Sequence, residues 1–311
     1  VENCTITENY AAHEGAGIYS GGNTVIIRNS TISNNTAKSD NFFGVFGIGI
    51  YNTKNLIIEN STIDNNKVTS GGSGGGIYNS EYGIVTIRNS QIINNEAFVG
   101  GGIFNHSYGA LTGQVTIEDS LISGNSGGSA IYNSGQMTIN NTAIDQNISY
   151  STIRNDGKMT ITASSISENT GTAVSNVGRI TLTNVTISGN TLDTSIPESG
   201  AGIYNNGYYT PGGAIVEANF VTIVNNTAVS EGYGGIYNYP INSVVKIKNS
   251  IVANNKRGNQ VLNCSTGYFD SQGVNFADDG TCTGFTQVTS AQLNLQPLGN
   301  YSGPTQTHAL G

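Results

Sequence analysis

Charged side chains are scarce in this sequence, and long apolar runs are absent. Asp, Glu, Lys and Arg make up 10% of 311 residues, and 12 Lys and Arg against 20 Asp and Glu give a net charge of −8. This balance argues against nucleic acid and anionic membrane surfaces as partners, because both attract a basic protein surface. No stretch approaches the ~18 apolar residues of a membrane span, so we expect no direct membrane insertion.

The sequence also lacks a secretory leader and has few cysteines. Val1 opens directly into repeat-like sequence, so we expect a processed or trimmed piece of a longer protein. Of three cysteines, Cys264 and Cys282 are a plausible disulfide pair, and Cys4 is left over as an expected buried free thiol. A disulfide fits an extracellular or periplasmic location.

What is present is a repeated phrase. "GAGIYS…VIIRNSTISNNTA" begins at Gly15, "GIGIYN…LIIENSTIDNNKV" at Gly47, and "GGGIYNSEYGIVTIRNSQIINNEAF" at Gly74. Each phrase holds three short segments in which apolar and polar residues alternate with a period of two, which is typical of strands. Differences in length between phrases then fall in the loops, where they disturb neither the core nor the strand pairing.

The shortest repeats indicate the architecture. Ile131 to Ile153 and Ile153 to Val174 span 22 and 21 residues, about one turn of a three-sided parallel β-helix. We therefore predict an all-β, single-stranded parallel β-helix of about ten coils. We expect residues 1–255 to form the repeats and residues 256–311 to form a C-terminal cap that holds the disulfide, because an open solenoid end exposes core and strand edges.

Asparagine recurs in columns. An amide side chain both donates and accepts hydrogen bonds, so the Asn residues of successive coils can form a ladder. The column that ends each phrase is Asn9, Asn35, Asn66, Asn95, Asn125, Asn147, Asn169, Asn190, Asn226 and Asn255. A second column is Asn52, Asn79, Asn105, Asn133, Asn155, Asn176, Asn205 and Asn238, and a third is Asn29, Asn60, Asn89, Asp119, Asn141, Asn184 and Asn249. We predict three structural ladders and no metal site, because a ligand site needs a few distinct residues.

Two outward columns also read as structure. Arg28, Glu59, Arg88 and Glu118 alternate in sign over four coils, which favours the correct register because a slipped coil would place like charges together. A column of aromatic residues is expected to stack as a ladder: Tyr19, Tyr51, Tyr78, Tyr132, Tyr204 and Tyr237. Threonines such as Thr138 and Thr160 form a patch of the kind that binds ice on flat β-solenoid faces. The neighbouring file contains charged residues that spoil a regular flat surface, so we expect an ordinary solvated strand face.

The phrases resemble the Gly-Gly-x-Ile-Tyr-Asn repeats of secreted and surface-displayed right-handed β-helix proteins, including the polymorphic outer-membrane-protein type. The tail, "NSIVANN…NC…GVNF…C…LQPLGNYSGPTQTHAL" over roughly Asn249 to Leu310, is similar to the end of the bacterial choice-of-anchor Q domain family. The resemblance implies a right-handed coil, export, and an anchoring segment after this domain, which we expect to be absent or cut off here. It implies no reaction and no catalytic residue.

Candidate catalytic groups are few. A glycoside hydrolase needs two carboxylates on adjacent coils, and the candidates are Asp64, Asp145, Glu168 and Glu217. Asp64 and Asp145 occupy equivalent columns three coils apart, about 14 Å. A lyase would need an acidic calcium-binding cluster, and the acidic pair Asp278-Asp279 reads as a turn. His106, in a loop, has no evident partner. We therefore expect no catalytic residue, no metal and no cofactor.

Binding is the better-supported hypothesis. The loops "NNGYYTPGG" and "SEGYGGIYNYP" belong to neighbouring coils and place Tyr208, Tyr209, Tyr233 and Tyr239 where their rings can gather. Tyr faces beside amide groups suit sugar rings. A second aromatic cluster is Phe42, Phe43 and Phe46. For both clusters the alternative is loop packing against the coils.

The sequence therefore predicts a secreted or cell-surface β-helix protein that is not an enzyme. The expected partner is a polysaccharide or surface glycan, so the protein would act in adhesion. A rod-like structural role is an equal alternative, in which copies stack into a filament or layer because the first coil has no evident cap. The alternative from another class is a polysaccharide lyase or glycoside hydrolase.

Overall fold

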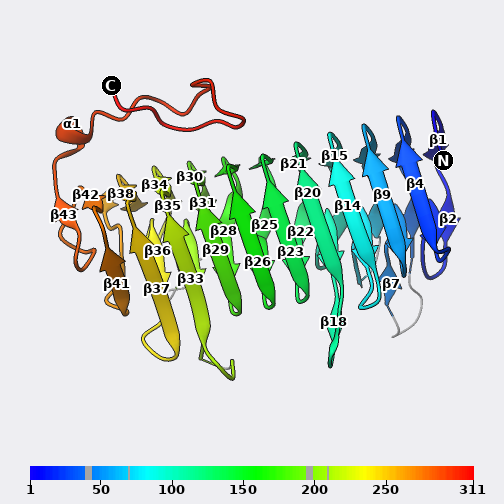
Figure 1. Ribbon diagram of the computed structural model, residues 1–311, viewed down its shortest axis with the longest axis horizontal. Coiled ribbons are helices and arrows are strands. Elements are labelled where there is room, and N and C mark those ends of the chain that lie inside the picture. Colours follow the sequence, from blue (N-terminus) through cyan, green and yellow to red (C-terminus); the bar gives the residue numbers. More distant parts are fainter. Residues whose placement is uncertain (39–43, 69–70, 194–198, 209) are drawn as a thin grey trace. The chain divides into compact units, whose positions relative to one another are not determined.

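The computed structural model of the protein describes residues 1–38, 44–68, 71–193, 199–208 and 210–311. These residues divide into an N-terminal unit, Val1–Ser149, and a C-terminal unit, Tyr150–Gly311, with the boundary inside β25 (Ile148–Asn155). Each unit is a right-handed parallel β-helix with three sheets, which we call A, B and C, as the sequence predicted. Strands of the three sheets follow one another around each coil, and short turns join them (Figure 1).

The N-terminal unit contains the following strands. Sheet A holds β4 (Thr24–Arg28), β9 (Asn55–Glu59), β14 (Ile84–Arg88), β20 (Gln114–Glu118) and β23 (Gln136–Asn140). Sheet B holds β1 (Thr5–Thr7), β5 (Thr31–Ser33), β10 (Thr62–Asp64), β15 (Gln91–Ile93), β21 (Leu121–Ser123) and β24 (Ala143–Asp145). Sheet C holds β2 (Tyr10–Ala11), β3 (Ile18–Ser20), β6 (Thr36–Ala37), β8 (Ile50–Asn52), β11 (Lys67–Val68), β13 (Ile77–Asn79), β16 (Glu96–Ala97), β17 (Ile103–Asn105) and β22 (Ser126–Asn133). Two further pairs are β7 (Val45–Phe46) with β12 (Gly72–Ser73), and β18 (Ser107–Tyr108) with β19 (Leu111–Thr112).

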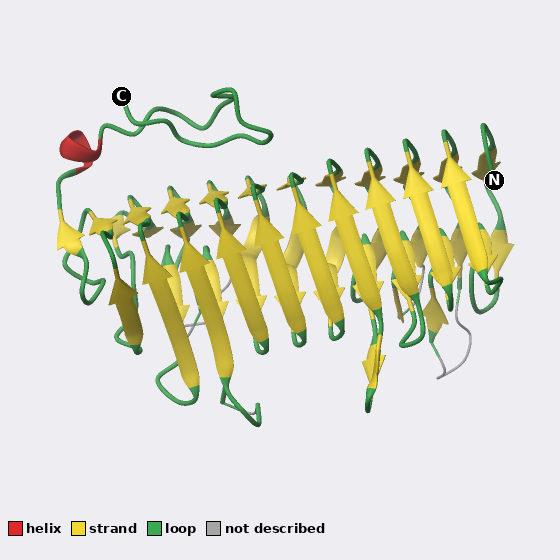
Figure 2. Ribbon diagram, viewed as in Figure 1, coloured by secondary structure: helices red, strands yellow, loops and turns green. Residues whose placement is uncertain are grey.

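The C-terminal unit repeats this plan. Sheet A holds β26 (Lys158–Thr162), β29 (Arg179–Thr183), β33 (Ala214–Asn219), β37 (Ser243–Lys248) and β41 (Phe269–Gln272). Sheet B holds β27 (Ser165–Ser167), β30 (Thr186–Ser188), β34 (Thr222–Val224), β38 (Ile251–Ala253), β42 (Phe276–Ala277) and β43 (Thr286–Gln287). Sheet C holds β28 (Thr170–Asn176), β31 (Thr191–Leu192), β32 (Ile203–Asn205), β35 (Thr227–Ala228), β36 (Ile236–Asn238), β39 (Lys256–Arg257) and β40 (Gln260–Val261). The one helix of the described residues is α1 (Ser290–Leu293), drawn red in Figure 2.

The core of each unit follows from the alternation in the strands. Val85 and Ile87 of β14 are 1% and 0% exposed, and they pair in register with Val115 and Ile117 of β20. The residues between them face outward. Each coil places its aliphatic side chains directly over those of the next, so these side chains are removed from water. Full burial of one Ile side chain stabilises the folded state by roughly 2–3 kcal/mol.

The ladder of phrase-ending Asn residues is confirmed. Asn66 Nδ2 donates to Asn95 Oδ1 at 2.9 Å, and Asn95 Nδ2 donates to Asn125 Oδ1 at 3.1 Å. The backbone N–H of each of these residues also donates to the Oδ1 of the next, so the side chains satisfy the turn as well as one another. In the C-terminal unit the ladder extends beyond the sequence prediction, because Asn255 Nδ2 donates to Asn263 Oδ1 at 2.9 Å.

The second Asn column is also a ladder, but the third is not one of the same kind. Asn79 Nδ2 donates to Asn105 Oδ1 at 2.9 Å and both residues are fully buried. The third column shares a left-handed backbone instead, with φ of 50° at Asn60 and 48° at Asn89. Asn tolerates this conformation better than other side chains that have a Cβ. The recurrence in the third column therefore reflects the turn conformation.

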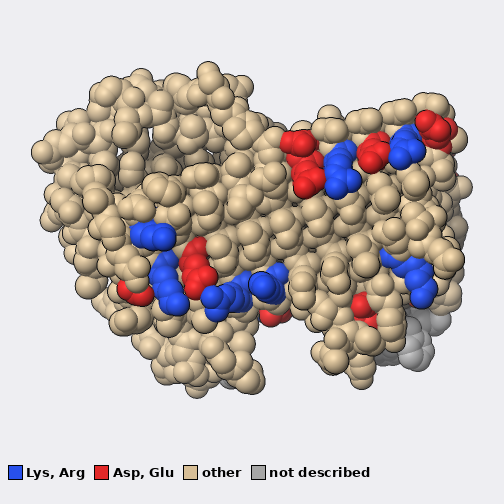
Figure 3. Space-filling model, viewed as in Figure 1, with Lys and Arg blue, Asp and Glu red and all other residues tan. Residues whose placement is uncertain are grey.

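The two outward columns are confirmed in the N-terminal unit, whereas in the C-terminal unit the rings of Tyr204 and Tyr237 are 5.8 Å apart and tilted by 38° and so do not stack. Arg28 Nε lies 2.7 Å from Glu59 Oε2, and Arg88 Nε lies 2.7 Å from Glu118 Oε2. Red and blue atoms alternate along this row in Figure 3. In sheet C the rings of Tyr51 and Tyr78 stack at 5.2 Å between centroids, and the stack continues to Phe104 and Tyr132 at 5.0 and 4.7 Å.

Because of this stack, we expect the stability of the N-terminal unit to fall at alkaline pH, where the tyrosines ionise. Burial, together with the charge of Glu14, raises the pKa of Tyr51 to about 12 from 10.0, and burial also raises the pKa of Tyr78. A folded-state pKa above the unfolded value means that stabilisation is complete below about pH 10 and declines as pH rises toward 12.

We therefore expect the decline in the urea midpoint between pH 10 and pH 12 to be less steep in a Tyr51→Phe/Tyr78→Phe variant than in the parent. A Tyr150→Phe variant is the control, since this ring is 73% exposed and outside the stack. Equal slopes for the parent and the double variant would contradict the prediction.

The tail folds back on the C-terminal unit. Cys264 and Cys282 form the predicted disulfide, and β41 and β42 continue sheets A and B beyond Asn255. His308 is buried, with Nε2 2.8 Å from Ser188 Oγ and Nδ1 2.7 Å from the Gln296 carbonyl. The expectation for Cys4 is wrong: its thiol is exposed, because the first turn of the chain leaves it on the surface. The described residues contain no helix with the length and hydropathy that a membrane crossing requires.

Candidate functional site

Two tyrosines of the predicted cluster, Tyr208 and Tyr239, lie in the loops that lead from sheet C to sheet A in the C-terminal unit, whereas Tyr233 precedes β36 within sheet C. Tyr208 is in the loop before β33, and its ring meets that of Tyr239 edge-on at 5.5 Å. Tyr233 instead packs against the ring of Tyr237 at 5.5 Å, and Tyr237 lies 6.5 Å from Tyr239. Tyr209 lies outside the described residues. The structure thus brings three of the four predicted tyrosines together, with Tyr237 between them.

Local hydrogen bonds hold the loop that carries Tyr208. Asn206 Oδ1 accepts from the Tyr208 backbone N–H at 2.9 Å, while Asn206 Nδ2 donates to the Tyr204 hydroxyl at 2.6 Å. The Gly207 N–H donates to Ser243 Oγ at 2.8 Å, which ties the loop to the next coil. A side chain at Gly207 would collide with the Asn242 carbonyl, so this close approach requires glycine.

The exposure of the rings limits what this cluster can bind. The Tyr208 side chain is 45% exposed, whereas Tyr237 is 9% exposed and Tyr233 and Tyr239 are half-buried. The exposed ring of Tyr208, held edge-on by Tyr239, offers one apolar face beside the amide of Asn206. This face is about as large as one sugar ring. Tyr233 acts mainly in packing.

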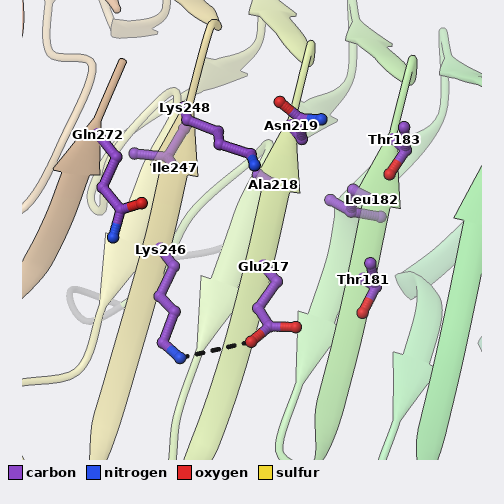
Figure 4. Close-up of a pocket in the computed structure, with 10 residues that line it drawn as sticks. All are labelled: Thr181, Leu182, Thr183, Glu217, Ala218, Asn219, Lys246, Ile247, Lys248 and Gln272. Atoms are coloured by element: carbon purple, nitrogen blue, oxygen red, sulfur yellow. Dashed lines mark hydrogen bonds and ion pairs between the residues drawn. The ribbon is translucent and has the colours of Figure 1, made fainter.

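A second feature occupies the outer face of sheet A in the C-terminal unit. Residues of β29, β33, β37 and β41 surround a hollow of about 330 Å³ (Figure 4). The hollow is lined by Thr181, Leu182, Thr183, Glu217, Ala218, Asn219, Lys246, Ile247, Lys248 and Gln272. Its floor therefore combines two cations and one carboxylate with hydroxyl and amide groups.

Glu217 is held between two cations. Its Oε1 lies 2.7 Å from Arg179 Nη2 and 3.4 Å from Lys246 Nζ. The pairing follows from register, because Glu217 stands beside Lys246 in sheet A and Arg179 begins the strand on the other side. The sequence identified Glu217 as a candidate acid but missed both cations. Aligning the outward file Thr181, Glu217 and Lys246 across coils could have found Lys246, and Arg179 stands two residues before Thr181 on the same strand.

Two further hollows lie toward the two ends of the same strands. At the start of β33 and β37, residues of the 210–213 loop with Asn242 and Val244 surround about 390 Å³. At the other end, a hollow of about 340 Å³ lies between the tail and the starts of β30 and β34. Its lining is Ala163, Asn184, Val185, Thr186, Phe220, Thr222, Gly303, Pro304, Thr305 and Thr307. Thr307 Oγ1 lies 2.8 Å from Thr186 Oγ1, which fixes the tail at that edge.

The remaining candidate carboxylates are engaged in structure. Asp64 accepts a hydrogen bond from Asn94 Nδ2 at 3.0 Å, and the register of β10, β15, β21 and β24 places Asp145 three strands away. Glu168 occupies a turn with φ of 56°. Asp278 accepts from Asn263 Nδ2 at 2.8 Å and so ends the buried Asn ladder. None of these arrangements resembles an acid–base pair.

The histidines and phenylalanines add two observations. His106 does have a partner, since its Nδ1 lies 3.3 Å from Glu81 Oε2, a contact that depends on two loops of unrelated sequence. Phe46 packs against Tyr78 at 5.1 Å, whereas Phe42 and Phe43 lie outside the described residues. Across the described ranges, no group of three or more His, Cys, Asp or Glu side chains is arranged to share a metal ion.

Comparison with known families agrees with the fold. Residues 1–112 match a family described as a right handed beta helix region. No curated protein matches the sequence. The family description names an architecture, so it supports a β-helix repeat protein and assigns no reaction to the sites described above.

Proposed function

We propose that this chain is an exported, surface-displayed β-helix protein that binds polysaccharide without cleaving it. Within the β-helix proteins we assign it to the repeat type that resembles the choice-of-anchor Q and polymorphic outer-membrane proteins. The observation that carries the binding role is the exposed ring of Tyr208, which Tyr239 and the Asn206 turn hold in place. Ordered rings lose little entropy when a sugar stacks on them. The buried disulfide supports export, because such bonds persist in oxidising compartments.

The test is a glycan array followed by titration of the best neutral ligand. We expect Tyr208→Ala/Tyr239→Ala to weaken its binding by about 2 kcal/mol, roughly thirtyfold, since the sugar loses its stacking face. Tyr150→Ala is the matched control, because its ring is 73% exposed but has no part in this cluster. Unchanged affinity in the double variant would contradict the proposed site.

A second candidate function, polysaccharide cleavage, is favoured by one arrangement. Glu217 and Asp270 occupy the same outward file of sheet A with Lys246 between them. Two strand steps separate their backbones by about 10 Å. In inverting glycoside hydrolases the two carboxyl groups are about 6.5–9.5 Å apart, a separation that these side chains would reach by leaning toward each other. We place it second because Glu217 is already paired with Arg179 and Lys246. Release of reducing ends or unsaturated products that Glu217→Gln abolishes would establish it over binding alone.

A further inference from the structure

We propose that the outer face of sheet A in the C-terminal unit binds an acidic polysaccharide through Arg179, Lys246 and Lys248. This inference deepens the proposed function, on which it rests for the class of ligand, but it concerns a different surface from the tyrosine cluster. The recognising groups are cations beside hydroxyls and amides. The shared chemistry of the ligand is a polymer that carries carboxylate or sulfate groups.

The strand geometry places the cations on one surface. Lys246 and Lys248 both face outward from β37 and are exposed, while Val245 and Ile247 between and beside them are buried. Two residues along a strand separate these lysines by about 7 Å. Arg179 projects from β29 on the far side of β33 and reaches Glu217. Lys246 and Lys248 therefore line the hollow shown in Figure 4, and Arg179 reaches its edge through the ion pair with Glu217.

Positive charge exceeds negative charge on this face. The outward positions of the five strands of sheet A in the C-terminal unit carry Lys158, Arg179, Lys246 and Lys248 against Glu217 and Asp270. The chain as a whole has a net charge of −8, so this excess runs against its composition. Blue atoms gather over these strands in Figure 3. Such a surface raises the local concentration of anions.

The charge of Lys248 is available to a ligand. Both acids of the face have other partners: Glu217 pairs with Arg179 and Lys246, and Asp270 accepts from Gln272 Nε2 at 3.1 Å. Within the part of the chain that the structure describes, no carboxylate lies within ion-pair distance of Lys248 Nζ. Its side chain extends over the floor toward β33 (Figure 4). A ligand carboxylate or sulfate at this position would gain a charge-assisted hydrogen bond.

The shape of the surface favours a polymer over a small anion. Hollows of about 390, 330 and 340 Å³ lie at the start, the middle and the end of β33, the last of them against the tail residues Gly303, Pro304, Thr305 and Thr307. Thr181, Thr183 and Asn219 line the central one and supply donors and acceptors for sugar hydroxyls. A single small anion would use only the lysines, whereas several linked sugars would contact the whole run.

The test compares polygalacturonate, dextran sulfate and neutral dextran by isothermal titration at low and high salt. We expect the parent protein to bind at least one acidic polymer and to bind neutral dextran at least tenfold more weakly. Affinity for the acidic polymer should fall as salt rises, because the contacted charges are exposed. The stronger of the two acidic polymers identifies carboxylate or sulfate as the recognised group.

Lys246→Gln/Lys248→Gln should reduce affinity for the acidic polymer roughly tenfold, since two exposed charge contacts are lost. Lys54→Gln/Lys67→Gln is the control, because it removes two exposed lysines of the N-terminal unit and changes net charge equally. Circular dichroism and a thermal midpoint establish that both variants are folded. Equal losses in the two variants, no loss in the first, or equal binding of dextran and the acidic polymers would overturn the inference.

The same set of proteins separates this inference from the proposed function. If Tyr208→Ala/Tyr239→Ala loses the neutral ligand but keeps the acidic polymer, both sites stand. If the acidic polymer binds and depends on the lysines while no array ligand depends on the tyrosines, only the cationic surface stands. If the tyrosine-dependent ligand binds and no acidic polymer does, the inference drawn here is wrong and the tyrosine site remains.

Discussion

Replacing Asn95 by alanine is expected to lower the free energy of unfolding by about 3–4 kcal/mol. Asn95 is fully buried, and its Oδ1 accepts from both the N–H and the Nδ2 of Asn66, at 3.0 and 2.9 Å. Its Nδ2 donates to the Ile63 carbonyl at 2.9 Å and to Asn125 Oδ1 at 3.1 Å. Alanine leaves these groups without water or a new partner, and each buried orphan costs about 1–3 kcal/mol.

The matched control is the neighbouring residue. Asn94 has φ of 55° and an exposed side chain, so Asn94→Gly keeps the backbone conformation and removes one exposed hydrogen bond to Asp64. We expect a change within about 0.5 kcal/mol for this variant. Urea denaturation followed by circular dichroism measures both. If the two variants lose similar stability, the ladder does not stabilise the fold in the way we argue.

Removing the disulfide is expected to destabilise the C-terminal unit by about 3 kcal/mol. The bond between Cys264 and Cys282 has a sequence separation of 18 residues, and both cysteines are at most 5% exposed. Cys264 also pairs with Ile236, so the bridge fastens the segment that carries Asn263 to the last coils. A Cys264→Ser/Cys282→Ser variant loses the constraint on the unfolded chain and leaves two hydroxyls at positions that are at most 5% exposed.

Cys4 supplies the control and an independent check. Cys4→Ser should leave the unfolding midpoint unchanged, because this thiol is exposed and outside the disulfide. Thiol titration of the native protein should find one reactive group per chain, and titration after reduction and unfolding should find three. Two or more thiols in the native protein, or equal midpoints for the parent and the double serine variant, would contradict the disulfide assignment.

The repeated part of this protein was open to prediction from sequence because each coil meets the same environment as its neighbours. Val115 and Ile117 are buried for the same reason as Val85 and Ile87, so the constraint appears in every phrase. The Asn66, Asn95 and Asn125 ladder is visible for the same reason. The third Asn column shows the limit: a ladder and a left-handed turn both select Asn, and only the backbone angles separate them.

The candidate sites were less predictable because they lie in loops or between coils of unequal length. Glu81 lies in a loop and belongs to none of the repeated columns, so no sequence pattern shows its contact with His106. Asn263 enters the ladder from a segment that pairs antiparallel with its neighbour. The cationic face required knowing that Arg179 and Lys246 flank Glu217 across three strands.

By itself, the sequence determined the parallel β-helix, its inward aliphatic columns, two buried Asn ladders, the Arg–Glu row and the disulfide partners. Only the tertiary structure decided that Tyr233 packs on Tyr237, that Tyr208 stays exposed against Tyr239, and that Lys246 of β37 shares Glu217 with Arg179 at a hollow that Lys248 also lines. The physical reason is the range of the interactions. Stacking between equivalent positions repeats along the chain and leaves a periodic record, whereas contacts among loops of different length depend on the path that each loop takes in space.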